Sequence, residues 1–297
     1  MGLIAFLFPG QGSQVVGMRG KTGGDDTLFR RADQVLGLGL TRLVDEGPQE
    51  ELTQTANAQP ALLVTGLTAA TAVEKLGRTP DVVLGHSLGE YTALVQAGVL
   101  EFEDALRLVR LRGELMARAV ASTPGRMAAV IGAEPSALEA LVAELSRDGI
   151  LEITNRNAPG QVVLSGEERM IGRAVDELKA RRVGRGMPLD VSAPFHSSMM
   201  RPMAEQFGKA LEDVVFSRPS LRFIDNVTGG EEVEPGLIRE KLVRQLYSPV
   251  LFEQGVLTAA GMGVTTFVEC GPKTVLSGLV KRIVKDVEIL SSEALLA

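Results

Sequence analysis

Residues 82–97 join a short apolar run to a helical pattern through a turn that contains two glycines. Val82-Val83-Leu84 is the fully apolar segment typical of a strand that is buried on both faces, and the helical pattern begins at Glu90. Between them lies Gly85-His86-Ser87-Leu88-Gly89. The glycines permit a sharp turn that exposes the serine hydroxyl at the carboxyl end of a sheet. A strand, a tight turn and a helix in this order predict an α/β fold with a parallel sheet.

Segments typical of strands and of helices also alternate on both sides of residues 82–97. Apolar runs predict further strands at 4–8, 127–131, 150–155, 161–165, 186–191, 221–225 and 266–269. Helical spacing predicts helices at 58–75, 102–120, 135–147, 167–182, 198–211, 235–245, 251–260 and 274–284.

Residues 123–191 have an order of their own, strand-helix-strand-strand-helix-strand, which is that of a ferredoxin-like unit. They follow Ser122-Thr123-Pro124-Gly125, which we interpret as a hinge. We therefore predict a ferredoxin-like subdomain over 123–191. It is inserted into a discontinuous α/β-hydrolase-like domain with a mainly parallel sheet, formed by 1–122 and 192–297.

The composition narrows the classes of function. Apolar residues make up 45% of the 297 and charged residues 23%, which are globular proportions. The net charge is −6, aromatics are 4% and tryptophan is absent, which argues against binding to nucleic acid or anionic membranes. The single cysteine, Cys270, allows no intrachain disulfide and fits a cytoplasmic protein. With two histidines, a zinc site built on His and Cys is excluded, and we expect no metal.

No apolar run approaches the roughly 20 residues of a membrane-spanning helix. The apolar segment at residues 1–9 lacks basic residues and ends at Pro9-Gly10, so we interpret it as a buried strand and not as a signal peptide. We expect no association with membranes.

Ser87 is the predicted nucleophile, and a serine hydroxyl needs a base and donors for the oxyanion. The turn aims the Leu88 N–H at the reacting carbonyl, although an ordinary serine in a glycine-rich turn has the same pattern. His86 is adjacent to Ser87, and neighbouring side chains of an extended chain diverge, so we expect it to be hydrogen-bonded behind the turn. His196 lies where a strand meets a helix; it is either the base or a histidine satisfied at a helix start.

A second glycine loop follows the first strand, in Phe8-Pro9-Gly10-Gln11-Gly12-Ser13-Gln14. Its backbone N–H groups could serve an oxyanion. It is not a phosphate-binding Walker loop, because no Gly-Lys-Ser/Thr follows.

Seven segments in this order closely resemble the malonyl-CoA:acyl carrier protein transacylases, over about residues 4–285. They are Pro9-Gly10-Gln11-Gly12-Ser13-Gln14, Gly85-His86-Ser87-Leu88-Gly89-Glu90-Tyr91, Leu111-Arg112-Gly113, Asn157-Ala158-Pro159-Gly160-Gln161-Val162-Val163, Ala193-Pro194-Phe195-His196-Ser197, Val243-Arg244-Gln245-Leu246-Tyr247-Ser248-Pro249-Val250 and Glu269-Cys270-Gly271-Pro272.

The resemblance implies a Ser–His dyad. Ser87 would carry the acyl group and His196 would be the general base, with no carboxylate partner. The backbone carbonyl of Gln245 would orient the imidazole. The backbone N–H groups of Gln11 and Leu88 would form the oxyanion hole.

The resemblance also implies the substrate contacts. Arg112 would pair with the free carboxylate of malonyl, since a guanidinium binds a carboxylate through two parallel bonds that lysine cannot reproduce. On spacing alone, an arginine on a long helix is typically on a solvated face. Phe195 resembles the malonyl-selective pattern and would crowd an α-methyl branch, which gives preference and not exclusion. We also assign Gln161 to substrate binding.

The implied partners are malonyl-CoA as donor and an acyl carrier protein as acceptor, with no bound cofactor and with a monomeric enzyme. Carrier proteins are usually acidic, so a local basic patch is expected; the candidates are Arg181, Arg182, Arg185 and Lys273. Arg126 stands where relatives usually carry a small residue, near regions that could touch carrier or CoA. Cys270 is interpreted as a core residue at a strand end.

Two other functions are compatible with the pattern. One is an editing hydrolase that clears acyl chains from carrier proteins, but such relatives are expected to lack the arginine at position 112. The other is a silent docking protein of a synthase complex, in which Ser87 or His196 would be expected to be lost. The pathway, fatty-acid or polyketide synthesis, stays open.

Overall fold

The computed structural model describes residues 2–23, 25–122, 124–189, 191 and 193–297. Its larger sheet has five strands in the order β7-β2-β1-β8-β9, and every neighbouring pair is parallel. Their bounds are β1 (Leu3–Phe8), β2 (Val82–Gly85), β7 (Arg222–Ile224), β8 (Val264–Glu269) and β9 (Glu288–Ser291). The predicted parallel α/β domain is confirmed.

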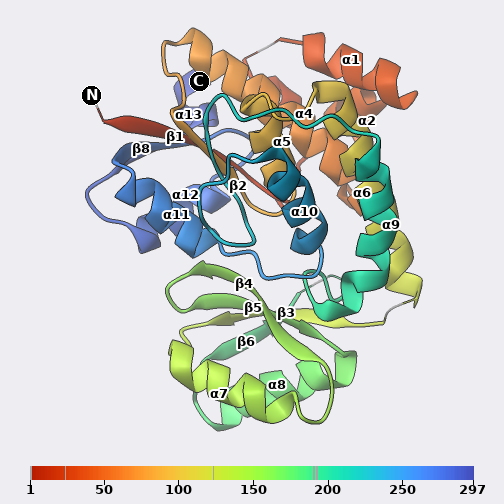
Figure 1. Ribbon diagram of the computed structural model, residues 1–297, viewed down its shortest axis with the longest axis vertical. Coiled ribbons are helices and arrows are strands. Elements are labelled where there is room, and N and C mark those ends of the chain that lie inside the picture. The colour runs from red at the N-terminus through yellow and green to blue at the C-terminus, as the bar shows by residue number, and fades with distance from the viewer. Residues whose placement is uncertain (1, 24, 123, 190, 192) are drawn as a thin grey trace.

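Helices cover this sheet on both sides (Figure 1). One apolar core joins β1 and β2 to the α4–α6 side, and a second joins them to the α11–α12 side. The helices of the larger domain are η1 (Met18–Lys21), α1 (Thr27–Leu36), α2 (Leu40–Glu46), α3 (Gln49–Thr53), α4 (Thr55–Lys75), α5 (Gly89–Gln96), α6 (Phe102–Ser122), η2 (Ser198–Met200), α9 (Arg201–Glu212), α10 (Pro235–Gln245), α11 (Phe252–Gly261), α12 (Val275–Ile283) and α13 (Ser292–Leu296).

The long helix α4 begins at Thr55, three residues before the predicted start, so Pro60 lies inside it. Proline has no N–H, and the carbonyl four residues earlier, that of Ala56, therefore lacks its helical donor. The Arg110 guanidinium donates to this oxygen at 3.1 Å. The Ala56 carbonyl therefore obtains its hydrogen bond from the neighbouring helix α6.

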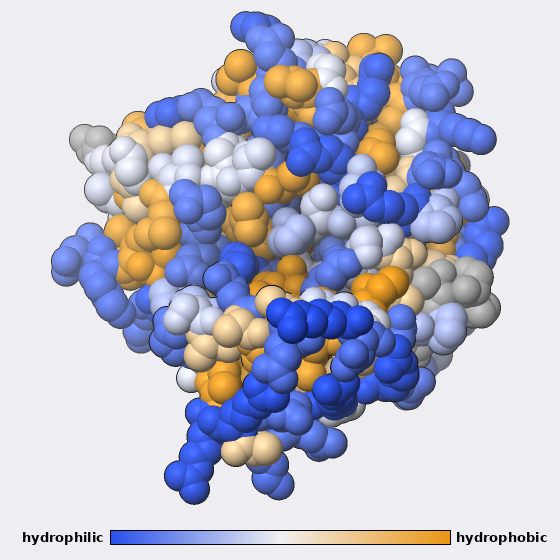
Figure 2. Space-filling view, turned by 60° about the horizontal axis from the view of Figure 1, so that its bottom comes forward, coloured by the Kyte–Doolittle hydropathy of each residue, from blue (hydrophilic) through white to orange (hydrophobic). Residues whose placement is uncertain are grey.

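The smaller subdomain is an antiparallel sheet in the order β4-β5-β3-β6 with two helices on one face (Figure 1). This is the strand order of a ferredoxin-like unit, as predicted. Its elements are β3 (Arg126–Ile131), α7 (Pro135–Leu145), β4 (Leu151–Ala158), β5 (Gln161–Gly166), α8 (Glu168–Ala180) and β6 (Arg185–Pro188). In Figure 2 this subdomain comes forward, and polar side chains cover most of the face while apolar ones form separate patches.

Some expectations differ from the structure. The helices between residues 18 and 53 and strand β9 were not expected, although the apolar residues of α1 have helical spacing, with Phe29 and Ala32 buried. β6 ends at Pro188 and not at residue 191. Thr123 of the expected hinge, and the domain limits at 123 and 192, lie outside the described residues. No helix in the described part of the chain is long and apolar enough to cross a membrane.

The two units meet along β4. Asn155 forms a parallel bridge with Val250, where the Arg156 N–H donates to the Val250 carbonyl at 2.9 Å and the Val250 N–H donates to Thr154 at 3.0 Å. The small sheet therefore lies against the carboxyl edge of the large one. In open α/β sheets, ligands bind outside this edge.

Candidate active site

The turn between β2 and α5 holds Ser87 in a strained conformation, with a φ of 53°. A Cβ on Gly85 would lie 2.0 Å from the Gly89 carbonyl carbon, and one on Gly89 would lie 1.9 Å from the Phe8 carbonyl oxygen. Both flanking residues must be glycine because backbone occupies the space of a side chain. The close packing pushes the Ser87 hydroxyl out at the edge of the sheet.

Asn226, just after β7, fixes this turn. The Ser87 N–H donates to Asn226 Oδ1 at 2.7 Å, and Asn226 Nδ2 donates to the Gly85 carbonyl at 2.7 Å. Asn226 is buried. Asn226 was not among the predicted site residues, although its place at the carboxyl end of a parallel strand was a usable signal.

His196 is placed as the partner of Ser87. Ser87 Oγ lies 2.8 Å from His196 Nε2, and His196 Nδ1 lies 2.7 Å from the Gln245 carbonyl oxygen. Because a carbonyl only accepts, Nδ1 carries the proton and Nε2 is free to accept the serine proton. Burial, helped by the Arg112 charge, lowers the pKa of His196 to about 3. The imidazole is therefore neutral at pH 7 and available as a base.

Arg112 on α6 is buried beside this pair. Its Nη2 donates to Ser87 Oγ and to Gln245 Oε1, each at 3.0 Å, and its Nη1 donates to Gln59 Oε1 at 2.9 Å and meets Met116 Sδ at 3.4 Å. All of these acceptors are neutral, and Nε has no partner in the described part of the chain. A buried guanidinium surrounded by neutral acceptors favours an anionic ligand at this point.

The Gln245 side chain forms hydrogen bonds with Ser87, Glu90 and Arg112. Its Nε2 donates to the Ser87 carbonyl at 2.9 Å and to Glu90 Oε2 at 2.5 Å, which turns its Oε1 toward Arg112. Burial raises the pKa of Glu90 to about 8, and the nearby Asp225 adds to the shift. The roles of the Gln245 side chain, Glu90 and Gln59 were not expected, since they depend on contacts between distant segments.

A cavity of about 280 Å³ opens above Ser87. Ser87, Arg112, Phe195 and His196 all line it, together with Gln11 and Leu88 and with residues from β3, β4 and β5 of the small subdomain. The backbone N–H groups of Gln11 and Leu88 donate to no acceptor within the described residues. They are therefore available to an oxyanion, and the oxyanion hole expected at these two positions stays a prediction.

Three further residues singled out in the sequence are His86, Gln161 and Cys270. His86 is hydrogen-bonded, as expected, because its Nε2 lies 2.8 Å from Asn157 Oδ1 of the small subdomain, and it also lines the cavity. The structure does not bring Gln161 to the cavity: its Oε1 accepts a bond from Arg282 of α12 at 2.6 Å. Cys270 is fully buried at the end of β8, as expected.

The basic residues expected near the carrier protein or CoA do not lie together in the structure. Arg126 pairs with Glu168 at 3.2 Å on the surface of the small subdomain. Arg181 pairs with Glu144 and Glu177 of α7 and α8. Lys273 lies beside the glycine loop and donates to the Gly12 carbonyl at 3.1 Å. Of these three, only Lys273 touches a residue that lines the cavity.

No group of three His, Cys, Asp or Glu side chains that could hold a metal ion occurs among the described residues. A strained serine on a strand–turn–helix, a neutral histidine held by a carbonyl and free backbone donors define a serine acyltransferase or hydrolase. Residues 5–297 match the family model described as acyl transferase domain. The chain therefore belongs to the acyltransferases.

Individual relatives show to which group of acyltransferases the chain belongs. The chain is 45% identical over 289 residues to the malonyl CoA-acyl carrier protein transacylase of Bacillus subtilis (strain 168), covering 95% of this chain and 91% of that protein. A crystal structure of an acyl carrier protein S-malonyltransferase from Vibrio cholerae is 41% identical with a TM-score of 0.93, covering 97% of this chain and 96% of that one. The chain belongs to the malonyl CoA-acyl carrier protein transacylases, and it is an acyltransferase.

A second similar structure contains a partner. It is a malonyl-transacylase in complex with its type II polyketide synthase acyl carrier protein, 39% identical with a TM-score of 0.94, covering 99% of this chain and 98% of that one. The family thus includes members that serve polyketide synthesis.

Proposed function

We propose that this protein moves a malonyl group from malonyl-CoA to the phosphopantetheine thiol of an acyl carrier protein through a malonyl ester on Ser87. The observation that carries the proposal is the position of Arg112, with Nη2 3.0 Å from Ser87 Oγ. An acyl group on Ser87 would have a buried guanidinium within reach of its far end. A free carboxylate is the group that such a guanidinium binds best.

In the first half-reaction, Ser87 Oγ attacks the thioester carbonyl while His196 Nε2 takes the hydroxyl proton. The Gln11 and Leu88 N–H groups donate to the oxyanion that forms. The intermediate then expels the CoA sulfur, which receives the proton from His196, and the malonyl-Ser87 ester remains. The second half-reaction reverses these steps with the carrier thiol in place of CoA, and no step requires a cofactor or metal.

The Phe195 ring lines the same cavity and would crowd an α-methyl branch, so malonyl is preferred over methylmalonyl. We place the enzyme in the cytoplasm and treat it as a monomer. The acceptor belongs either to fatty-acid or to polyketide synthesis, and transfer rates to carrier proteins of both kinds distinguish the two.

The test is intact-mass measurement after mixing with malonyl-CoA. We expect one malonyl adduct that disappears in Ser87→Ala, because the hydroxyl is the acceptor. An adduct that survives this substitution would overturn the mechanism.

An editing hydrolase is the second candidate, with the same Ser87–His196 pair. The neutral surroundings of Arg112 favour a carboxylated acyl group, which such a hydrolase does not require. We expect malonyl-carrier protein to be hydrolysed far more slowly than malonyl is transferred. Rapid hydrolysis of acetyl-carrier protein would favour the editing role, and a fluorophosphonate that fails to label Ser87 would favour a docking protein.

A further inference from the structure

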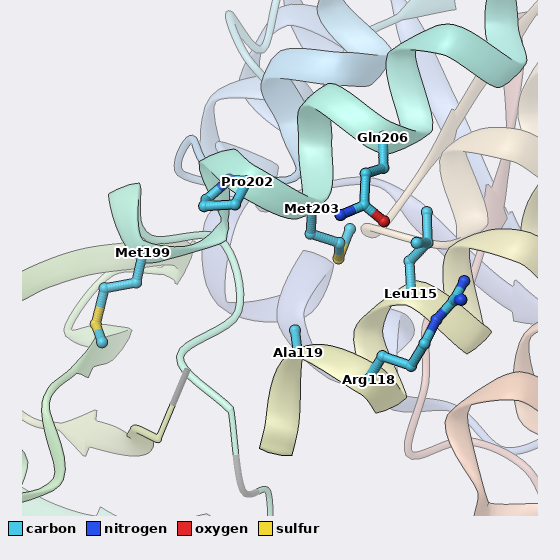
Figure 3. Close-up of a pocket in the computed structure, with 7 residues that line it drawn as sticks. All are labelled: Leu115, Arg118, Ala119, Met199, Pro202, Met203 and Gln206. Carbon is cyan, nitrogen blue, oxygen red and sulfur yellow. The ribbon is translucent and has the colours of Figure 1, made fainter. Parts of the chain in front are cut away.

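A second cavity, of about 160 Å³, lies between α6 and α9. Leu115 and Ala119 of α6 line it on one side, and Met203 and Gln206 of α9 line it on the other. Figure 3 shows the Met203 side chain pointing toward the α6 residues. Neither Ser87 nor His196 lines this cavity, so it is separate from the one that contains the nucleophile.

The side chains around a narrow gap form a layer beside the Ser87 cavity. They are those of Arg112, Met116, Phe195, His196, Met200, Met203 and Leu246, and the gap has no space for a water molecule. The first four also line the Ser87 cavity, and Met203 also lines the second cavity. Met203 is the one residue that belongs both to this layer and to the lining of the second cavity.

Of the three methionines in this layer, Met116 and Met203 are held differently. Met116 Sδ accepts a bond from Gln59 Nε2 at 3.1 Å and meets Arg112 Nη1 at 3.4 Å, so its position is tied to that of Arg112. Met203 Sδ has no hydrogen bond among the described residues and packs in the apolar core. An unbranched thioether held only by packing adapts its shape easily, and its removal leaves no polar group unpaired.

We infer that Met203 limits the size of the acyl group on Ser87 by closing the Ser87 cavity against the cavity between α6 and α9. This inference rests on the proposed function. A malonyl group bonded to Ser87 and paired with Arg112 has its α-carbon beside the layer, because Arg112 and His196 both belong to it. An alkyl substituent on that carbon needs the space that the Met203 side chain fills.

The test compares acyl loading of Ser87 from malonyl-CoA and from methyl-, ethyl- and propylmalonyl-CoA, followed by intact mass over time. We expect Met203→Ala to join the two cavities and to raise the ratio of ethylmalonyl to malonyl loading by about tenfold or more, since pocket contacts of this size discriminate by that amount. Met203→Leu keeps most of the volume and should keep the ratio of the unsubstituted protein.

Met199→Ala is the matched control. Met199 lines only the second cavity and lies apart from the other side chains at its edge, so we expect an unchanged ratio. If Met203→Ala does not fold, Met203→Val makes a smaller opening with the same expected direction. An unchanged ratio in a folded variant that still loads malonyl overturns the inference. Failure of the unsubstituted protein to load malonyl overturns the proposed function instead.

Discussion

Ser87 and His196 both adopt left-handed backbone conformations, with φ values of 53° and 63°. Such a conformation costs a side chain-bearing residue on the order of 1–2 kcal/mol, so surrounding contacts must hold it. The Ser87 N–H and carbonyl are bound by the side chains of Asn226 and Gln245, and the His196 ring is bound by the Gln245 carbonyl. Two amide residues thus maintain the strain that brings nucleophile and base together.

The lowered pKa of His196 predicts an unusual pH profile. Since burial brings this pKa to about 3, the ring stays neutral through the mildly acidic range. We expect the rate of Ser87 labelling by a fluorophosphonate to change little between about pH 7.5 and 5.5, whereas an ordinary histidine of pKa near 6.5 would lose about tenfold. His196→Asn should label slowly at every pH. A tenfold loss in the unsubstituted protein would contradict the shifted pKa.

At the scale of elements, the turn between β2 and α5 packs against the end of β1. Gly89 is the closest point, where a Cβ would lie 1.9 Å from the Phe8 carbonyl oxygen. This requirement is steric, since Gly89 begins helix α5 with ordinary helical geometry. The same contact positions the N-terminus of α5, with its positive end, at the site of the oxyanion.

Gly89→Ala should therefore lower the free energy of unfolding by about 3 kcal/mol or more, because a backbone carbonyl cannot move out of the way. Urea denaturation measures this change. Gly172→Ala is the control: Gly172 lies within α8 and an added Cβ meets nothing within 4 Å. It should raise the stability by about 0.5–1 kcal/mol, as alanine does in a helix. Equal effects at the two positions would refute the steric argument.

At the scale of the molecule, the small subdomain supports the loop that carries the base. Ser165 of β5 donates to the Phe195 carbonyl at 2.9 Å. The Glu152 carboxylate of β4 accepts bonds from the backbone N–H and the hydroxyl of Ser198, the former at 2.9 Å. The base is therefore held by the large domain through Gln245 and by the small one through these two residues.

Glu152→Ala should loosen this loop, since it leaves the Ser198 N–H without its acceptor at a cost of about 1–3 kcal/mol. We expect faster hydrogen exchange over residues 193–200 and slower labelling of Ser87. Glu139→Ala removes an exposed pair with Arg156 in the same subdomain and should change neither quantity. Unchanged exchange in Glu152→Ala would show that the subdomain does not support the base.

The sequence by itself determined the elements with strong local periodicity. The strand–turn–helix around Ser87 and the six elements of residues 123–191 follow from patterns within a few residues, because burial of one face imposes that spacing. The short helices between residues 18 and 53 escaped prediction. Helix α1 is amphipathic and carries a pattern that predicts it, whereas η1, α2 and α3 have only four, seven and five residues and are stabilised by packing against α4.

The resemblance named Ser87, His196, Arg112 and the Gln245 carbonyl, but not the buried network that aligns them. Asn226 lies 139 residues from Ser87, and Gln245 lies 155 residues from Glu90. No spacing rule links such distant polar residues. Only the tertiary structure decided which of them meet. The packing of β7 and α10 against the β2–α5 turn brings particular groups within hydrogen-bond distance, and a buried amide bonds to the partner that it finds there.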